Sequence, residues 1–189
     1  MKKPLERLSF EDILREIKKA ERENRVANLS YKLLPEFSFS EKEIKTSINL
    51  EGSTIQGAIY FDKCIIEGDV ILNNCLIYTT LYFDNTQVKG SLLGKNLHIR
   101  EVINLISSRF DKDINLEEAK IYGFLGLNKI SVGGNLNLRK ISVFDIQTPT
   151  GTIRGDIYLQ NAKIEGSVII EDAFFQGLGN FQDRILKIT

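Results

Sequence analysis

An 11-residue repeat is the feature of this chain that most restricts its fold. From Ser47 to Gly177 the sequence divides into twelve units with the pattern x-φ-x-φ-x-x-small-x-φ-x-Gly, where φ is apolar and the ninth unit lacks one residue. The second position is Ile, Val or Leu in all twelve units, and eight of the eleven intact units end in glycine. A repeat of this kind predicts stacked structural units rather than an ordinary globular core.

The pattern within one unit predicts short strands. Alternating apolar positions indicate a strand that turns every second side chain to one face, and the terminal glycine indicates a corner with a tight bend or a positive φ. Each unit therefore supplies inward side chains at positions 2, 4, 7 and 9. One unit cannot bury this apolar edge alone, whereas stacked units bury a continuous column. We expect an all-β chain that forms a parallel β-solenoid.

Near-copies within the repeat predict the length of one coil. The segments IYFDKC at 59–64 and LYFDNT at 81–86 lie 22 residues apart, and SINLEGS at 47–53 and DINLEEA at 113–119 lie 66 apart. Two units per coil then give about six coils at the ~4.8 Å spacing of strands. Phe61 and Phe83 should stack, opposite a column of Leu50, Leu72, Leu116 and Leu138. A coil of 11 residues has too few inward side chains to fill its interior.

Units such as DINLEEAKIYG and DIYLQNAKIEG resemble the pentapeptide-repeat superfamily, in its variant with 11-residue G-D-L-x-L-x-x-A-x-I-x-G repeats. The resemblance covers residues 47–177. It implies a right-handed, four-sided parallel β-helix in which each side turns one small and one large residue inward. The small position holds Ser53, Cys64, Cys75, Thr86, Ser108, Ala119, Ala162 and Ala173, and the chain departs from the family at Leu97, Ile130 and Ile141.

Residues 1–46 lie outside the repeat and predict a helical cap. Ser9 and Asp12 form a capping-box pattern, and the apolar residues that follow have helical spacing, which places an amphipathic helix at about 9–25. Its candidate contact residues are Phe10, Ile13, Leu14 and Ile17. We favour a lid over the first coil, because an open solenoid end exposes strand edges, and keep a docking or dimerisation helix as the alternative. Residues 27–46 should lead into the solenoid as irregular strand.

Two further segments are candidates for contacts. Thr148, Pro149 and Thr150 interrupt the repeat, and since proline cannot donate to a strand ladder this coil should loop outward. The C-terminal residues 178–189 are short and apolar, with Phe181, Ile185 and Ile188 as candidate contact residues. They suit either a cap on the last coil or a homodimer contact through that end, with a slight preference for the dimer.

The residues that usually carry chemistry do not converge in this sequence. His98 occupies an outward position without neighbouring ligand residues, and Cys64 and Cys75 occupy the small inward position on opposite sides of the coil. We therefore expect no catalytic residue, no cofactor and no metal site. Asp113, Glu117 and Glu118 would be the residues of the enzymatic alternative, a carbohydrate-active β-helix, and are better explained as a solvated face.

Charge and hydropathy exclude several partners. The chain has 25 basic and 25 acidic residues, which argues against nucleic acid as a partner, and no apolar run approaches the ~20 residues of a membrane helix. Two cysteines and the absence of a signal-peptide pattern predict a cytoplasmic protein.

We expect a non-enzymatic interaction or scaffold module whose protein partner the sequence does not identify. The first alternative is a protein that self-assembles into dimers or filaments. The second is a DNA mimic that occupies topoisomerases, as some proteins of the resembled family do. The many lysines and arginines among the acidic residues of the repeat weaken the DNA-mimic interpretation.

Overall fold

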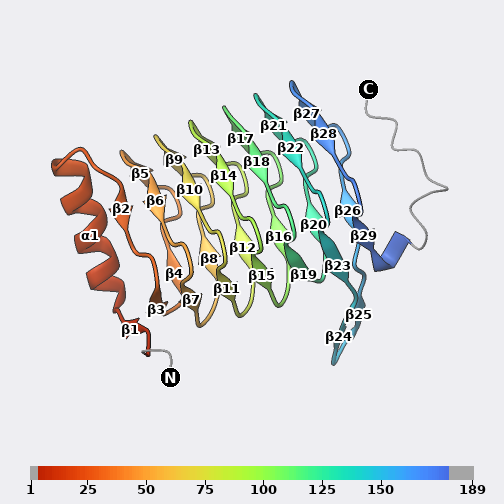
Figure 1. Cartoon of the computed structure of the whole chain (residues 1–189), viewed down its shortest axis with the longest axis horizontal. Helices are drawn as coiled ribbons and strands as arrows, with labels where there is room; N and C mark the ends of the chain where they lie inside the picture. Colours follow the sequence, from red (N-terminus) through yellow and green to blue (C-terminus); the bar gives the residue numbers. More distant parts are fainter. Residues whose placement is uncertain (1–3, 179–189) are drawn as a thin grey trace.

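The computed structural model describes residues 4–178 and shows a parallel β-solenoid with one α-helix at its N-terminal end (Figure 1). Strands of successive coils pair in parallel and form four long sheets within these residues. Paired residues in the regular coils lie 22 apart, as in Val70 with Leu92 and Leu81 with Ile103. This confirms the four-sided β-solenoid with two units per coil.

Each coil contributes one strand to each of four sheets, which we call sheets A to D. Sheet A consists of β1 (Glu6–Arg7), β3 (Lys32–Leu34), β7 (Thr54–Ile55), β11 (Leu76–Ile77), β15 (His98–Ile99), β19 (Lys120–Tyr122), β23 (Ser142–Phe144) and β29 (Phe174–Phe175). Sheet B consists of β2 (Ala27–Asn28), β6 (Ile48–Asn49), β10 (Val70–Ile71), β14 (Leu92–Leu93), β18 (Ile114–Asn115), β22 (Leu136–Asn137) and β28 (Val168–Ile169). Sheet C consists of β4 (Phe37–Ser38), β8 (Ile59–Tyr60), β12 (Leu81–Tyr82), β16 (Ile103–Asn104), β20 (Leu125–Gly126) and β26 (Ile157–Tyr158). Sheet D consists of β5 (Glu43–Ile44), β9 (Ile65–Ile66), β13 (Gln87–Val88), β17 (Arg109–Phe110), β21 (Ser131–Val132) and β27 (Lys163–Ile164).

The core is a set of side-chain columns inside the coil. The predicted aromatic stack is present, with ring centroids 4.8 Å apart for Phe61 and Phe83, and it extends to Phe39 at 5.9 Å from Phe61. Leu116 and Leu138 of the predicted leucine column are fully buried. Inward positions are apolar in nearly every coil because each coil buries them against the next.

The small inward position also carries hydrogen bonds. Ser53 Oγ donates to the carbonyl of Leu29 at 2.7 Å, and the thiols of Cys64 and Cys75 donate to the carbonyls of Phe39 and Leu50, both at 2.8 Å. Thr86 and Ser108 continue this series to the carbonyls of Phe61 and Phe83. Hydroxyls and thiols are therefore tolerated in the core because each has an acceptor in the preceding coil. Bulky Leu97 fits the same position because Gly94 beside it has no side chain.

The glycine at the end of each unit is required by close packing between coils. A Cβ on Gly166 would lie 2.6 Å from Asn135 Oδ1, and that oxygen accepts the backbone N–H of Ser167 from the next coil. Positive φ is found instead at position 6, in residues such as Lys63, Asn74 and Asn96. Of the two features expected at the terminal glycine, the bend is present in most units and positive φ is found only at Gly123. The close approach of the neighbouring coil explains the residue in the other units.

The helix α1 (Phe10–Arg22) closes the N-terminal end of the solenoid. Ser9 and Asp12 form the predicted capping box, with Asp12 Oδ2 accepting the Ser9 backbone N–H at 3.0 Å. Ile13 and Ile17 are buried in the core, and Phe10 continues the aromatic stack at 5.9 Å from Phe39. The helix is therefore a cap, as expected, and it ends a few residues earlier than predicted.

The solenoid begins one coil before Ser47. Residues 27–46 form β2 to β5, which pair with the strands of the next coil, for example Ala27 with Ile48 and Phe37 with Ile59. These residues were expected to be an irregular lead-in, and the structure corrects that expectation. The first unit of this coil, residues 26–35, has ten residues and no terminal glycine, so it does not fit the 11-residue pattern. Its inward side chains nevertheless occupy the same columns as those of the next coil.

The tenth unit of the sequence repeat leaves the coil, apart from its terminal glycine. Residues 146–153 form an antiparallel hairpin of β24 (Ile146–Thr148) and β25 (Gly151–Ile153), which projects from the solenoid (Figure 1). Leu125 pairs with Ile157 across this insertion, a separation of 32 residues instead of 22. Gly155 then takes the corner position that follows Phe144. The predicted outward loop is confirmed, whereas the count of twelve coil-forming units is wrong. The described chain ends in a 3-10 turn, η1 (Gln176–Leu178).

Candidate functional site

The outward surfaces of sheets B and D carry several charges that are paired with one another. On sheet D, Lys89 Nζ lies 2.7 Å from Glu67, and Arg109 Nε lies 2.6 Å from Asp111. On sheet B, Lys95 Nζ lies 3.1 Å from Glu117. Exposed pairs of this kind contribute little stability and are typical of a solvated face.

Sheet A has a different outward surface. Its inward residues, such as Ile77, Ile99 and Ile121, are buried, so the alternate residues point to solvent. From β7 to β29 these outward residues include no Asp or Glu; they are Thr54, Gln56, Leu76, Tyr78, His98, Arg100, Lys120, Tyr122, Ser142, Phe144, Phe174 and Gln176. We call this surface the sheet A face.

Aromatic rings and a guanidinium group stack along the sheet A face. Arg100 lies over the ring of Tyr78, with 4.1 Å between Cζ and the ring centroid. Further along, Tyr122 and Phe144 stack at 5.1 Å, and Phe144 meets Phe174 at 5.7 Å. Tyr78, Tyr122 and Phe174 nevertheless remain 38–47% exposed. Large aromatic side chains that stay this exposed on a rigid surface are typical of binding sites.

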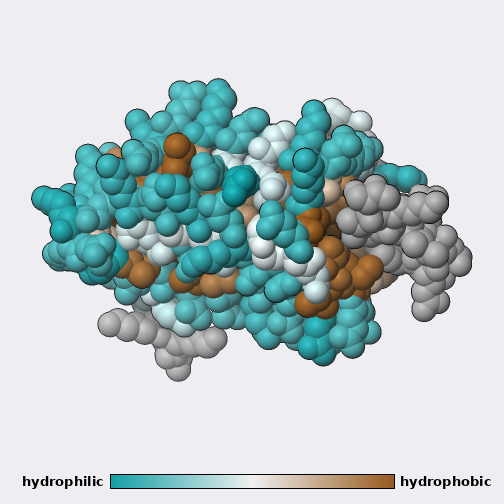
Figure 2. All heavy atoms as spheres, turned by 90° about the horizontal axis from the view of Figure 1, so that it is seen from above, coloured by the Kyte–Doolittle hydropathy of each residue, from teal (hydrophilic) through white to brown (hydrophobic). Residues whose placement is uncertain are grey.

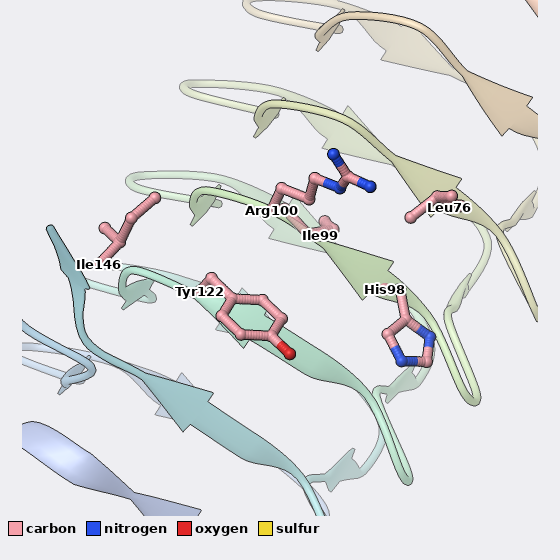
Figure 3. A pocket seen from close by; sticks show the side chains of 6 residues that line it. All are labelled: Leu76, His98, Ile99, Arg100, Tyr122 and Ile146. Atoms are coloured by element: carbon pink, nitrogen blue, oxygen red, sulfur yellow. The ribbon is translucent and has the colours of Figure 1, made fainter. Parts of the chain in front are cut away.

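A groove of about 410 Å³ runs between this face and the base of the hairpin, lined by Leu76, His98, Ile99, Arg100, Tyr122 and Ile146. Figure 3 shows the Tyr122 ring between Ile146 and His98, while Arg100 reaches toward the strand that carries Leu76. Three successive coils, those of β11, β15 and β19, and the hairpin thus meet here. The walls combine the apolar side chains of Leu76, Ile99 and Ile146 with the Tyr122 ring and with the polar groups of His98 and Arg100.

The electrostatics of the groove are positive. Arg100 and Lys120 form no ion pair within residues 4–178, whereas the arginines of the neighbouring faces do. Partial burial and then the nearby Lys120 ammonium lower the pKa of His98 below its ordinary value. A lowered pKa keeps the imidazole neutral at pH 7, so the positive charge of the groove comes from Arg100 and Lys120.

The structure assigns different roles to the residues predicted from the sequence. Phe10, Ile13, Leu14 and Ile17 pack against the core under the helix, so they are not a free docking surface. Thr148, Pro149 and Thr150 form the tip of the hairpin, where Thr148 Oγ1 donates to the Gly151 carbonyl at 2.8 Å. Phe181, Ile185 and Ile188 lie outside the described residues.

The groove contains none of the contact residues predicted from the sequence. Tyr78, Arg100, Tyr122 and Phe144 all occupy position 10 of their units and follow one another at 22-residue intervals. Reading the outward columns every second unit would have placed these four side chains in one row. The contribution of Ile146 could not be found in this way, because the repeat pattern makes Ile146 an inward position-2 residue, whereas the structure places it in the hairpin.

The other reactive groups have structural surroundings. Burial raises the pKa of both thiols, that of Cys75 to about 12, so the reactive thiolate is disfavoured at both cysteines. Glu117 pairs with Lys95, and Asp113 Oδ1 accepts the Asn135 backbone N–H at 2.6 Å, so these carboxylates do not converge. Among the described residues, no group of three or more His, Cys, Asp or Glu side chains is arranged to hold a metal ion.

Comparisons with family models, curated proteins and solved structures give no match to this chain. Within residues 4–178, the helix is too short and too polar to span a membrane.

Proposed function

We propose that this protein is a non-enzymatic interaction module that presents the sheet A face and the adjoining hairpin to a protein partner. The observation that carries the proposal is the row of exposed aromatic side chains next to an unpaired arginine on one face of a rigid coil. Tyrosine, phenylalanine and arginine are enriched in protein interfaces and supply much of their binding energy. We also propose that the protein belongs with the pentapeptide-repeat superfamily and works in the cytoplasm, in keeping with its two free cysteines.

Site-specific photo-crosslinking in the native host tests this proposal. A photoreactive amino acid at Ser142, on the sheet A face, should give discrete higher-mass adducts in living cells. The same amino acid at Gln87, on the outward surface of sheet D, is the matched control and should give none. Equal adduct patterns at both positions, or none at Ser142, would contradict the proposed function.

Self-association is a second candidate, favoured by the surface of the last coil. Ile169 and Phe174 are 38% and 47% exposed there, and Figure 2 shows hydrophobic surface gathered beside the grey residues at this end. Sedimentation over a range of concentrations tests it. A dimer that the double substitution Ile185→Lys and Ile188→Lys converts to a folded monomer would support self-association. A wild type that remains monomeric at high concentration would exclude it.

A further inference from the structure

Arg100 is oriented to receive an anion. Tyr78 covers one face of its guanidinium group at 4.1 Å, which leaves the N–H groups at the edge of the plane available. Within residues 4–178 these N–H groups have no carboxylate or carbonyl acceptor. By contrast, Arg109 on sheet D and Arg139 on sheet B meet carboxylates at 2.6 and 3.2 Å. A stacked guanidinium with a free edge is suited to bidentate binding of a carboxylate.

The positive charge around Arg100 also favours a ligand with a carboxylate. Lys120 lies on the next strand, and the outward residues of sheet A from β7 to β29 include no acidic side chain. No acidic side chain of this face therefore neutralises its positive charges. On sheets B and D, by contrast, carboxylates pair with the lysines. A face of this kind attracts acidic partners and excludes basic ones.

The rest of the groove is suited to an apolar side chain. Leu76, the Tyr122 ring and Ile146 line it beside Arg100, and its volume of about 410 Å³ accommodates a large side chain. The groove is open, and the aromatic row continues beyond it through Phe144 to Phe174. An extended ligand can follow this row over several coils, which favours a peptide segment over a small molecule.

We propose that the groove binds an acidic segment of a partner protein, with a carboxylate on Arg100 and a neighbouring apolar or aromatic side chain between Tyr122 and Ile146. This inference rests on the proposed interaction function and specifies the chemistry of the partner. Ile146, at the base of the hairpin, forms one wall of this site.

The single histidine of the chain makes the test direct. His98 lines the groove, so its Cε1–H resonance in tag-free protein reports occupancy without assignment of the full spectrum. The probe is the capped peptide Gly-Asp-Phe-Glu-Leu-Gly, and the matched control is Gly-Asn-Phe-Gln-Leu-Gly. At constant pH, the acidic peptide should shift the resonance in a saturable way and bind at least tenfold more tightly than the amide peptide. Raising the salt concentration should weaken binding of the acidic peptide.

Three variants locate the binding on the molecule. Arg100→Gln should weaken the acidic peptide about tenfold or more, and Arg100→Lys should restore only part of the affinity, because an ammonium lacks the planar fork. Arg109→Gln removes an exposed arginine from sheet D and should leave the affinity unchanged. Unchanged melting curves would show that all three variants are folded.

Several results would overturn the inference. Equal affinity of the two peptides, no shift of His98 by the acidic peptide, or unchanged affinity in Arg100→Gln would each contradict it. Phenylacetate that binds as tightly as the peptide would indicate a small-molecule site instead. If Ser142 still crosslinks to a protein in cells while Arg100→Gln has no effect, the interaction function stands and the acidic partner is excluded.

Discussion

The first and last coils bury equivalent side chains to different extents. Ala27 and Leu29 of the first coil are fully buried, whereas Val168 and Ile170, which occupy the same columns after β22, are only partly buried. The difference follows from what covers each end. At the N-terminal end the helix α1 lies across the coil (Figure 1), whereas at the other end the described residues form only the 3-10 turn η1 and no α-helix.

This comparison shows that a solenoid coil depends on its neighbour for burial. A central coil is covered on both sides by other coils, and the first coil is covered by Ile13 and Ile17 of the helix. The helix therefore replaces a coil in the packing without continuing the repeat. The free energy of local unfolding should therefore be highest in the central coils, which have a coil on both sides, and lowest in the last coil.

The largest expected effect comes from placing a charge in one column at both ends. Leu29→Asp should unfold the protein or lower its stability by about 4 kcal/mol or more, because the carboxylate is buried without a partner. Ile170→Asp should cost less than half as much, since water reaches that position. Urea unfolding of both variants measures the difference. Equal losses would show that the last coil is as well covered as the first.

A smaller effect is expected from weakening the lid. Ile13→Ala removes a fully buried side chain between the helix and the first coil and should cost about 2–4 kcal/mol. Thermal unfolding followed by circular dichroism measures it. Lys18→Ala, on the exposed side of the same helix, is the control and should change stability by less than about 0.5 kcal/mol. An Ile13→Ala variant as stable as this control would contradict the role of the helix as a lid.

A charge on the central coils provides a third test, away from both ends. Burial and then the neighbouring Asp62 raise the pKa of Asp84, so the folded protein holds this proton more tightly than the unfolded chain does. Such a carboxyl contributes stability at low pH that is lost as the pH rises through its folded pKa. Asp84→Asn should therefore stabilise the protein slightly at pH 7, because the amide avoids the cost of burying the charge beside Asp62.

The pH dependence is the control for this variant. The gain should shrink as the pH falls toward the ordinary pKa of an aspartate, because the wild-type carboxyl is then protonated as well. Melting temperatures at pH 7 and pH 4 make the comparison. An Asp84→Asn variant that is less stable than wild type at pH 7 would show that the charge is favourable there.

The smallest effect is expected from removing the hairpin. Deleting residues 145–154 joins Phe144 to Gly155 and restores the 22-residue spacing between Leu125 and its partner strand. We expect a folded protein whose stability changes by less than about 1 kcal/mol, because little of the core is lost. Removing only residues 145–153 leaves one extra residue at the corner and should be clearly destabilising. Chemical unfolding of the two deletions would distinguish an insertion from an integral part of the coil.

Inward positions explain why so much of the fold could be predicted. Ile48, Val70, Leu92 and Ile114 lie in one column, and burial imposes the same requirement on each of them. The pattern does not detect the first coil because its first unit is one residue short and lacks the corner glycine, although Ala27 fits the Ile48 column and Leu29 fits the Leu50 column. A strict 11-residue pattern cannot detect a coil that keeps its core and changes a corner.

The sequence by itself therefore determined the solenoid, the coil length, the capped helix and the outward loop at Thr148–Thr150. The tertiary structure decided which outward residues meet, because Tyr78, Arg100 and Tyr122 are brought together only when coils stack at 22 residues. It also decided that Ile146 lines the groove, since this residue fits position 2 of the repeat and yet lies in the hairpin instead of the coil. The physical reason is that burial constrains inward side chains identically in every coil, whereas solvent imposes no common requirement on outward ones.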